Sequence, residues 1–269
     1  MKSKPTLFSR GGKLFVGMVH LLPLPGSPEY GGSFEPIVAR ALKDALALQE
    51  GGADALIMEN YGDVPFFADR VPPETVAAMA VVGRALRAEV SLPMGINVLR
   101  NDARSALAVA LAAGGDFIRV NVHSGAMVTD QGIVQGKAAE TIRARAALKA
   151  PIAVWADVMV KHSAPLGDYS LEGAAKDTAH RGLADALIVS GSGTGEATEL
   201  SRVKRVRAAV PGLPILIGSG TTPENLAGFL PFVDGFIVGT ALKEKGVTTN
   251  PVSLPRVRSF ARALRQKAR

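Results

Sequence analysis

The chain has 269 residues, 47% hydrophobic and 20% charged, with a formal net charge of +7, which is the usual size of one eight-stranded α/β barrel. It has no run of about 18 apolar residues, which excludes a membrane-spanning helix, and no cysteine, which excludes disulfides, thiolate catalysis and cysteine-based zinc sites. The N-terminal MKSKPTLFSRGGK lacks the apolar core of a secretory signal peptide, so we expect a cytoplasmic protein.

Short β-branched runs alternate with longer Ala- and Leu-rich runs of helical period, without an intervening linker. The predicted strands cover residues 14–19, 55–59, 94–99, 117–121, 152–157, 186–190, 215–218 and 235–239. The predicted helices cover residues 35–49, 73–90, 102–113, 137–149, 171–181, 198–209, 223–229 and 255–269. Eight regular units predict a single TIM-barrel domain, a (β/α)8 barrel over residues 1–269, with an open doubly wound sheet as the alternative.

Three helices are predicted to end at a glycine that leads directly into the next strand, in QEGGADALIME, AAGGDFIRVN and RGLADALIVS. Glycine ends a helix because it accepts a left-handed backbone at little cost. FVDGFIVG is a fourth, weaker copy. Such echoes are expected of a fold built from repeated βα units.

Two connections are longer than their turns require, at residues 21–34 and 122–136. The second contains MVTDQGIVQ, which predicts a small hairpin. Both follow strands at the carboxyl end of the predicted barrel, where long ordered loops often act as lids.

Polar residues are dense at the carboxyl ends of the first five strands, where barrel enzymes hold their reactive groups. The candidate catalytic residues are Glu59, Asp157, His20 and Arg119, and the candidate substrate-binding residues are Asn97, Asn121, His123, Lys161 and His162. Alternation along a strand puts Arg119, Asn121 and His123 on one face. A buried arginine needs a countercharge, so we predict that Arg119 pairs with Glu59 or Asp157, either to seal the barrel or to orient a substrate.

Glycine-rich turns follow the last three predicted strands: SGSGTG at residues 190–195, GSGTT at 218–222 and GTALK at 239–243. Glycine lets backbone N–H groups converge on an anion, and such turns often bind phosphate in barrels. The predicted phosphate-binding residues are Gly191, Gly193, Ser219, Gly220, Gly239 and Thr240. The alternative is that these glycines only make tight turns. None of the three is a Walker loop, because GK[ST] is missing.

A divalent metal is left open and no metal ligand is assigned. His20, Glu59, His123, Asp157 and His162 could supply ligands if they converged, but neither HExxH nor HxH occurs. Lys161 is interpreted as an anion contact, with a Schiff base as the alternative. Any other cofactor is unknown.

The positive charge concentrates on two predicted helices, at residues 202–207 and 256–269, where aromatic residues are scarce. We interpret both as solvated helix faces and expect no nucleic-acid partner, leaving a peripheral membrane contact open. Apolar residues on the helix around residues 76–82 are consistent with a homo-oligomer.

Eight strings in the chain resemble the BtpA/SgcQ family, which is associated by name with photosystem I biogenesis. They are GMVHLLPLPGSP (17–28), GGADALIMENYGDVPF (51–66), MGINVLRND (94–102), FIRVNVHSG (117–125), WADVMVKHS (155–163), ALIVSGSGTG (186–195), PILIGSGTTPEN (214–225) and DGFIVGTALK (234–243). The resemblance implies a TIM-barrel protein, and for some members a role in stable photosystem I or a place beside sugar-uptake genes. It implies no residue roles.

Two functions remain open. The first is an enzyme on a small phosphorylated substrate, a sugar phosphate or a ribose-phosphate conjugate, with isomerisation, aldol cleavage and glycosidic hydrolysis all compatible with acid/base groups at the strand ends. The second is a non-catalytic factor in membrane-protein biogenesis that uses the basic C-terminal helix.

Overall fold

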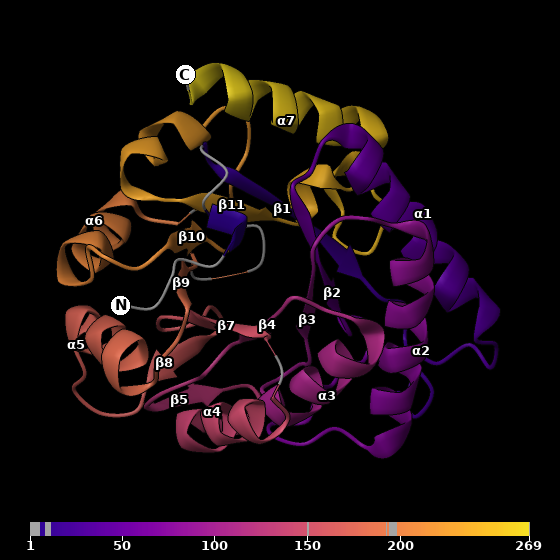
Figure 1. The fold of residues 1–269 in the computed structure, drawn as a ribbon, viewed down its shortest axis with the longest axis horizontal. Coiled ribbons are helices and arrows are strands. Elements are labelled where there is room, and N and C mark those ends of the chain that lie inside the picture. The colour runs from indigo at the N-terminus through magenta and orange to yellow at the C-terminus, as the bar shows by residue number, and fades with distance from the viewer. Residues whose placement is uncertain (1–5, 9–11, 150, 192, 194–197, 269) are drawn as a thin grey trace.

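A computed structural model describes residues 6–8, 12–149, 151–191, 193 and 198–268. Eight parallel strands close into a barrel (Figure 1), which confirms the predicted fold. In order around the barrel they are β1 (Leu14–His20), β11 (Gly235–Val238), β10 (Ile215–Ile217), β9 (Ala186–Val189), β7 (Ala153–Asp157), β4 (Phe117–Val120), β3 (Met94–Asn97) and β2 (Ala55–Glu59).

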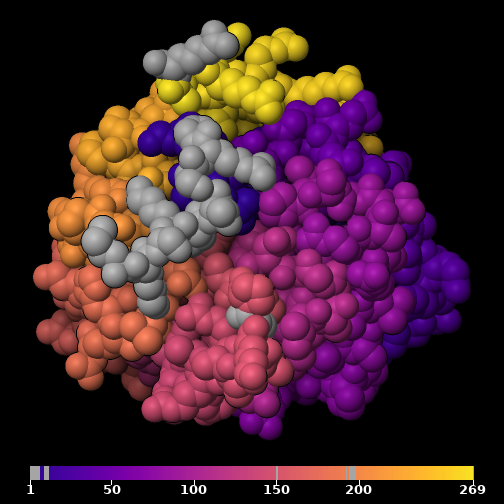
Figure 2. All heavy atoms as spheres, viewed as in Figure 1, coloured from indigo at the N-terminus to yellow at the C-terminus, as the bar shows by residue number. Residues whose placement is uncertain are grey.

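Amphipathic helices cover the outside of the barrel. They are α1 (Glu35–Gly51), α2 (Pro73–Glu89), α3 (Ala103–Ala113), α4 (Ala138–Ala147), α5 (Leu171–Lys176), α6 (Leu200–Ala209) and α7 (Leu254–Lys267). The last helix packs beside the first, and Figure 2 shows the yellow C-terminal segment next to the violet N-terminal one. The first and last α-helices therefore close the outer ring together.

Two predicted helices are wrong in part. Residues 223–229 form no α-helix; two short 3₁₀ turns occur instead, at Leu226–Gly228 and Leu230–Phe232. Gly228 is a poor helix former, and Pro231 lacks the N–H that would continue an α-helix. The predicted helix at 171–181 is α-helical only as far as Lys176 and continues as a π-helical turn, Asp177–Arg181.

Large apolar side chains fill the barrel interior beneath the strand ends. They include Ile57, Phe117 and Trp155, each two residues before Glu59, Arg119 or Asp157. Since residues two apart in a strand face the same side, the polar residues also face inward, as the alternation predicted. The interior core thus forms the floor of the carboxyl end.

The repeated segments have two structural explanations. Gly52 and Gly114 end their helices in the left-handed conformation, with φ of 91° and 76°, as predicted. At the third copy the prediction is wrong, because Gly182 has φ −76° and Leu183 takes the left-handed conformation. A Cβ on Gly182 would lie 2.7 Å from the Thr178 carbonyl oxygen, so close packing requires this glycine.

The aspartate of each repeat accepts a hydrogen bond from the backbone N–H of the preceding barrel strand. The four bonds, Phe15 to Asp54, Met94 to Asp116, Val154 to Asp185 and Ile215 to Asp234, are 2.8, 2.8, 2.8 and 2.9 Å long. They lie at the amino ends of the strands, the end that stabilises a barrel. The repeat therefore serves the fold.

A small antiparallel sheet lies outside the barrel. The predicted hairpin is confirmed as β5 (Ala126–Thr129) and β6 (Gly132–Gln135). The unpredicted strand β8 (Ser163–Pro165) pairs with β5 and so joins the connections after β4 and β7. Among the residues that the structure describes, no helix combines the length and apolar character needed to cross a membrane.

Candidate functional site

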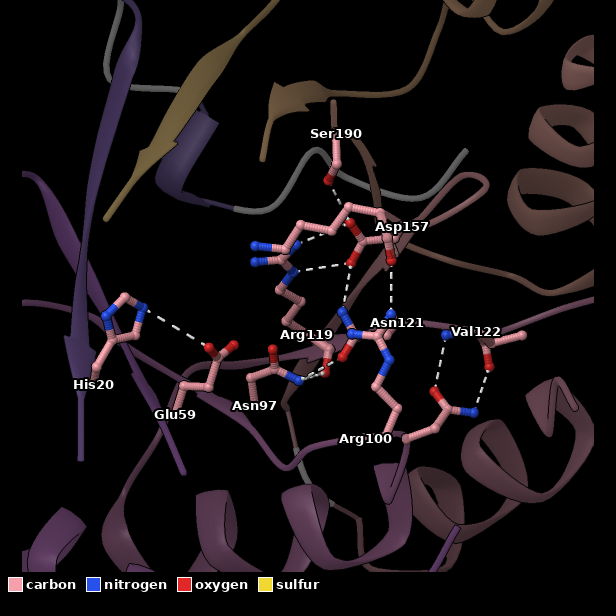
Figure 3. Close-up of polar contacts among 11 residues, drawn as sticks. His20, Glu59, Asn97, Arg100, Arg119, Asn121, Val122, Asp157 and Ser190 are labelled. Atoms are coloured by element: carbon pink, nitrogen blue, oxygen red, sulfur yellow. Dashed lines mark hydrogen bonds and ion pairs between the residues drawn. The ribbon is translucent and has the colours of Figure 1, made fainter. Parts of the chain in front are cut away.

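Arg119 and Asp157 form a buried ion pair at the carboxyl ends of neighbouring strands β4 and β7 (Figure 3). Nε and Nη2 of Arg119 donate to the two oxygens of Asp157, both at 2.9 Å. Asn121 donates to Oδ2 at 3.2 Å and Ser190 to Oδ1 at 2.9 Å. A carboxylate that accepts four hydrogen bonds is suited to holding a guanidinium in place. Asp157 is one of the two predicted partners of Arg119.

Asn97 extends this network toward β3. Its Nδ2 donates to the Arg119 carbonyl oxygen and to Oδ1 of Asn121, both at 3.2 Å. Asn97 Oδ1 is buried without a hydrogen-bond partner in the described part of the chain. Asn97 and Asn121 therefore brace the top layer of the barrel around Asp157.

His20 and Glu59 form a second cluster on β1 and β2, shown to the left in Figure 3. His20 Nε2 lies 3.8 Å from Glu59 Oε1, and Nδ1 lies 3.4 Å from the Thr248 carbonyl oxygen. Burial, helped by the charges of Lys243 and Lys161, lowers the pKa of His20 well below its ordinary value. The imidazole is therefore neutral at neutral pH.

Burial raises the pKa of Glu59, although the nearby cations Arg119, Lys161 and Arg100 oppose the shift. Burial and then the charge of Arg119 lower the pKa of Lys161 to about 8. Both shifts move the pKa of the side chain toward neutral pH, where a group transfers protons most effectively. Glu59 and Lys161 are thus the residues best suited to move a proton.

Two cavities meet at these residues. The inner cavity, about 150 Å³, is lined by the turns after β10 and β11. The outer cavity, about 690 Å³, is lined by the segments after β1, β2 and β3. Four residues line both: His20, Glu59, Arg119 and Lys161. These four residues therefore lie where the two cavities meet, and we call them the junction cluster.

The turn after β10 has a geometry that only glycine adopts easily. Gly220 has φ 67°, and Asn225 holds the turn by accepting from Thr222 N at 2.9 Å and donating to the Gly220 carbonyl oxygen at 2.8 Å. Ser219, Gly220, Gly239 and Thr240 all line the inner cavity. A Cβ on Gly239 would lie 3.1 Å from His20 Cε1, so this glycine lets the turn approach the cluster.

The structure does not bring every predicted residue to the cavities. His123 is turned toward Gly182, whose carbonyl oxygen lies 2.8 Å from Nε2. Gly191 donates its N–H to Ser219 Oγ at 3.0 Å, and neither it nor Gly193 is among the described residues lining the inner cavity. The rest of the predicted SGSGTG turn, residues 192, 194 and 195, lies outside the described residues. His162 is exposed at the rim of the outer cavity.

No three His, Asp or Glu side chains within the described ranges are grouped so as to hold a metal ion. With His123 turned away and Asp157 committed to Arg119, the five side chains considered as ligands do not converge. Within the part of the chain that the structure describes, these five side chains therefore do not form a shared ligand set.

Among the lining residues that sequence reasoning did not single out are Thr221, Arg100 and Tyr61. Thr221 is 2% exposed, lines the inner cavity, and its hydroxyl has no hydrogen-bond partner among the described residues. Arg100 and Tyr61 line the outer cavity, and the Tyr61 ring lies 4.7 Å from that of His20. Thr221 stood in the predicted GSGTT turn; Arg100 and Tyr61 follow strand ends and could have been found there.

Lys243, from the predicted GTALK turn, does not line either cavity. It is fully buried, and its Nζ lies 3.1 Å from Asp44 of α1. Asp44 also accepts from Val252 N at 2.8 Å. This ion pair fixes the segment that carries Thr248 to His20.

Comparison with known proteins identifies relatives along the whole barrel. The model of the BtpA family matches residues 12–266. The chain is 48% identical to an uncharacterized protein of Thermococcus kodakarensis, over 95% of this chain and 98% of that protein. It is 44% identical to the photosystem I biogenesis protein BtpA of Synechocystis, over 93% of this chain and 87% of that protein. It is 33% identical to the sgc region protein SgcQ of Escherichia coli, over 92% of each.

Solved structures share the barrel at low sequence identity. Phosphoribosyl anthranilate isomerase from Thermus thermophilus matches with a TM-score of 0.57 at 17% identity, over 94% of this chain and 99% of that one. A structure named "Native KDPGal structure" matches with the same TM-score and identity, over 94% of each chain. At this identity the likeness shows the fold alone.

Proposed function

The chain belongs to the BtpA family, and from that premise we propose that it is an enzyme acting on a small phosphorylated substrate, a sugar phosphate or a ribose-phosphate conjugate. The observation that carries the proposal is the inner cavity, where Ser219, Gly220, Gly239 and Thr240 meet the junction cluster. We assign the phosphate to this cavity. The buried Thr221 hydroxyl, which has no hydrogen-bond partner among the described residues, would gain an acceptor when phosphate binds.

The residues at the junction would do the chemistry. We assign proton transfer to Glu59 and Lys161, whose pKa values are shifted toward neutrality. Neutral His20 would hydrogen-bond a reacting oxygen, and Arg119, held by Asp157, would orient the substrate. Isomerisation, aldol cleavage and glycosidic hydrolysis each use such a set, so the reaction type is left open. The solved phosphoribosyl anthranilate isomerase, an enzyme named for a phosphorylated ribose compound, agrees with this chain in fold only.

Thr221→Val tests the phosphate site because it removes one hydroxyl at constant shape. Losing a hydrogen bond to a charged group should weaken the binding of inorganic phosphate about ten-fold, measured by calorimetry. Stability should not fall, because the buried hydroxyl has no partner to lose among the described residues. Thr141→Val is the control, since that buried hydroxyl donates to the Lys137 carbonyl oxygen away from the cavity. If the two variants bound phosphate with equal affinity, Thr221 would not be a phosphate contact. If the natural protein bound no phosphate, the proposal would be refuted.

A second candidate is the non-catalytic biogenesis factor, favoured by the name of the Synechocystis relative. It would use the basic residues of α7 on a membrane or partner. Several of these already bond to the protein: Arg258 pairs with Glu50, and Arg265 and Lys267 donate to carbonyl oxygens of Gly52 and Pro223. Binding elsewhere would break these bonds, which makes this candidate the weaker one.

We also propose that the protein is a cytoplasmic homo-oligomer. Val81 of α2 and Leu111 of α3 are 55% and 48% exposed on helices that pack against each other, and a second copy of the chain would remove this apolar surface from water. Light scattering tests this proposal, since a monomer mass in solution would refute it.

A further inference from the structure

The outer cavity is too large for the phosphorylated part of a small substrate alone. Its volume is about 690 Å³, whereas the inner cavity has about 150 Å³. Pockets that enclose a whole drug-sized ligand have roughly 300–1,000 Å³. A triose or pentose phosphate anchored in the inner cavity would leave most of the outer cavity as open water.

One wall of the outer cavity is apolar and partly aromatic. Leu21, Leu22 and Pro23 line it after β1, while Tyr61 and Phe66 line it after β2. The Tyr61 ring is supported by the His20 ring, 4.7 Å away. Flat aromatic faces beside aliphatic side chains are suited to stacking on a planar ring.

Much of the remaining lining is polar, and two of its residues carry buried atoms without a hydrogen-bond partner in the described ranges. One is Nε of Arg100, a donor on a side chain that is 5% exposed; the other is Oε1 of Gln131, an acceptor. Buried groups of this kind are costly unless a ligand satisfies them. The edge of a nitrogen heterocycle presents both donors and acceptors, and Arg100 and Gln131 give the lining a side-chain donor and a side-chain acceptor.

The junction cluster relates the two parts. His20, Glu59, Arg119 and Lys161 line both cavities, so a molecule that fills both has its middle beside them. For a phosphorylated sugar that bears a ring, this middle is the sugar carbon that carries the ring.

We infer that the substrate is a ribose-phosphate conjugate with a planar, nucleobase-sized heterocycle, whose phosphate occupies the inner cavity and whose ring occupies the outer one. The inference rests on the proposed function, because the phosphate anchors the molecule. It goes further by naming the group at the other end and the position of the bond to be changed.

Calorimetric titration with ribose 5-phosphate and with the four nucleoside 5′-monophosphates tests this assignment. At least one nucleotide should bind about ten-fold more tightly than ribose 5-phosphate, because stacking adds affinity. Phe66→Ala should remove most of that gain without changing the affinity for ribose 5-phosphate. Phe67→Ala is the matched control, since Phe67 is adjacent, 57% exposed and not among the lining residues. Tyr61→Ala provides a second variant on the same wall.

The outcomes separate this inference from the proposed function. If all five compounds bind equally well, or if Phe67→Ala and Phe66→Ala have the same effect, the ring site is refuted and the phosphate site stands. If neither ribose 5-phosphate nor a nucleotide binds the natural protein, both are refuted.

Discussion

Asp157 and Glu59 are both buried carboxylates at strand ends, yet their surroundings give them different roles. Asp157 accepts hydrogen bonds from Arg119, Asn121 and Ser190, all at 3.2 Å or less. Glu59 faces His20 at 3.8 Å and both cavities. The hydrogen bonds of Asp157 hold Arg119 in place, whereas burial raises the pKa of Glu59 toward the range in which a carboxyl group exchanges a proton.

Asp157→Asn should lower the free energy of unfolding by about 3–5 kcal/mol, because Arg119 would remain buried without a countercharge. Denaturant unfolding measures this change. Glu50→Gln removes the exposed pair with Arg258 and should have little effect. If the two variants lost the same stability, Arg119 would not depend on the charge of Asp157.

The pKa of Lys161, lowered to about 8, predicts how anion binding depends on pH. The ammonium group is present below this pH and lost above it, so sulfate should bind less tightly as the pH rises through about 8. Sulfate is the useful probe because its own charge is constant in this range. Lys161→Arg should give a nearly flat profile from about pH 7 to about pH 9.5, because the guanidinium stays protonated. A natural protein with a flat profile would show that Lys161 does not contact the anion.

At the scale of elements, packing inside the barrel depends on small residues that leave space for large side chains of the neighbouring strand. Gly95 of β3 lies beside the Phe117 ring, which stacks on Trp155 at a centroid distance of 3.7 Å. This stack fills the interior directly below Arg119 and Asp157. The site is therefore supported by a packed floor, and a change in the floor should reach the ion pair above it.

Gly95→Ala should lower the free energy of unfolding by roughly 1–3 kcal/mol, because overpacking forces neighbours out of place. The new Cβ would lie 2.2 Å from Phe117 Cε2. Gly212→Ala is the control, since a Cβ there has no atom within 4 Å. Thermal and denaturant unfolding compare the two. An unchanged Gly95→Ala protein would mean that the Phe117 ring can move aside.

For the whole molecule, the question is whether the cavities or the basic outer surface carry the function. α7 packs against α1 on the outside of the barrel, and its Arg258 forms an ion pair with Glu50 of α1. The two cavities instead lie within the carboxyl end, where barrel enzymes bind substrates.

The enzyme proposal predicts that the protein stays in the supernatant when mixed with anionic lipid vesicles and centrifuged. The triple variant Arg258→Gln, Arg262→Gln and Arg265→Gln should behave identically and bind phosphate as the natural protein does. Sedimentation of the natural protein with vesicles, abolished in the triple variant, would support the biogenesis factor instead. Electrostatic binding of that kind would weaken with added salt.

The sequence alone predicted the barrel, which the structure confirms, and it located the polar strand ends and the glycine-rich turns from which the candidate site is built. These rest on local rules: strand period, helical period and the position of polar residues at strand ends. The sequence-based predictions were wrong where contacts with distant parts of the chain position a side chain. The inward alternation of β4 continues one residue past its end to Asn121, which donates to Asp157, but not to His123, which is turned toward the Gly182 carbonyl oxygen.

Only the tertiary structure decided which of the predicted residues form ion pairs and which line the cavities. Sequence proximity could not show that Asp157 binds Arg119 while Glu59 borders two cavities, or that Lys243 is paired with Asp44, about two hundred residues away. The burial that shifts the pKa of Glu59 and Lys161 comes from all the strands that surround them. Charge and burial are properties of the whole assembled barrel end, which is why a strand read by itself does not contain them.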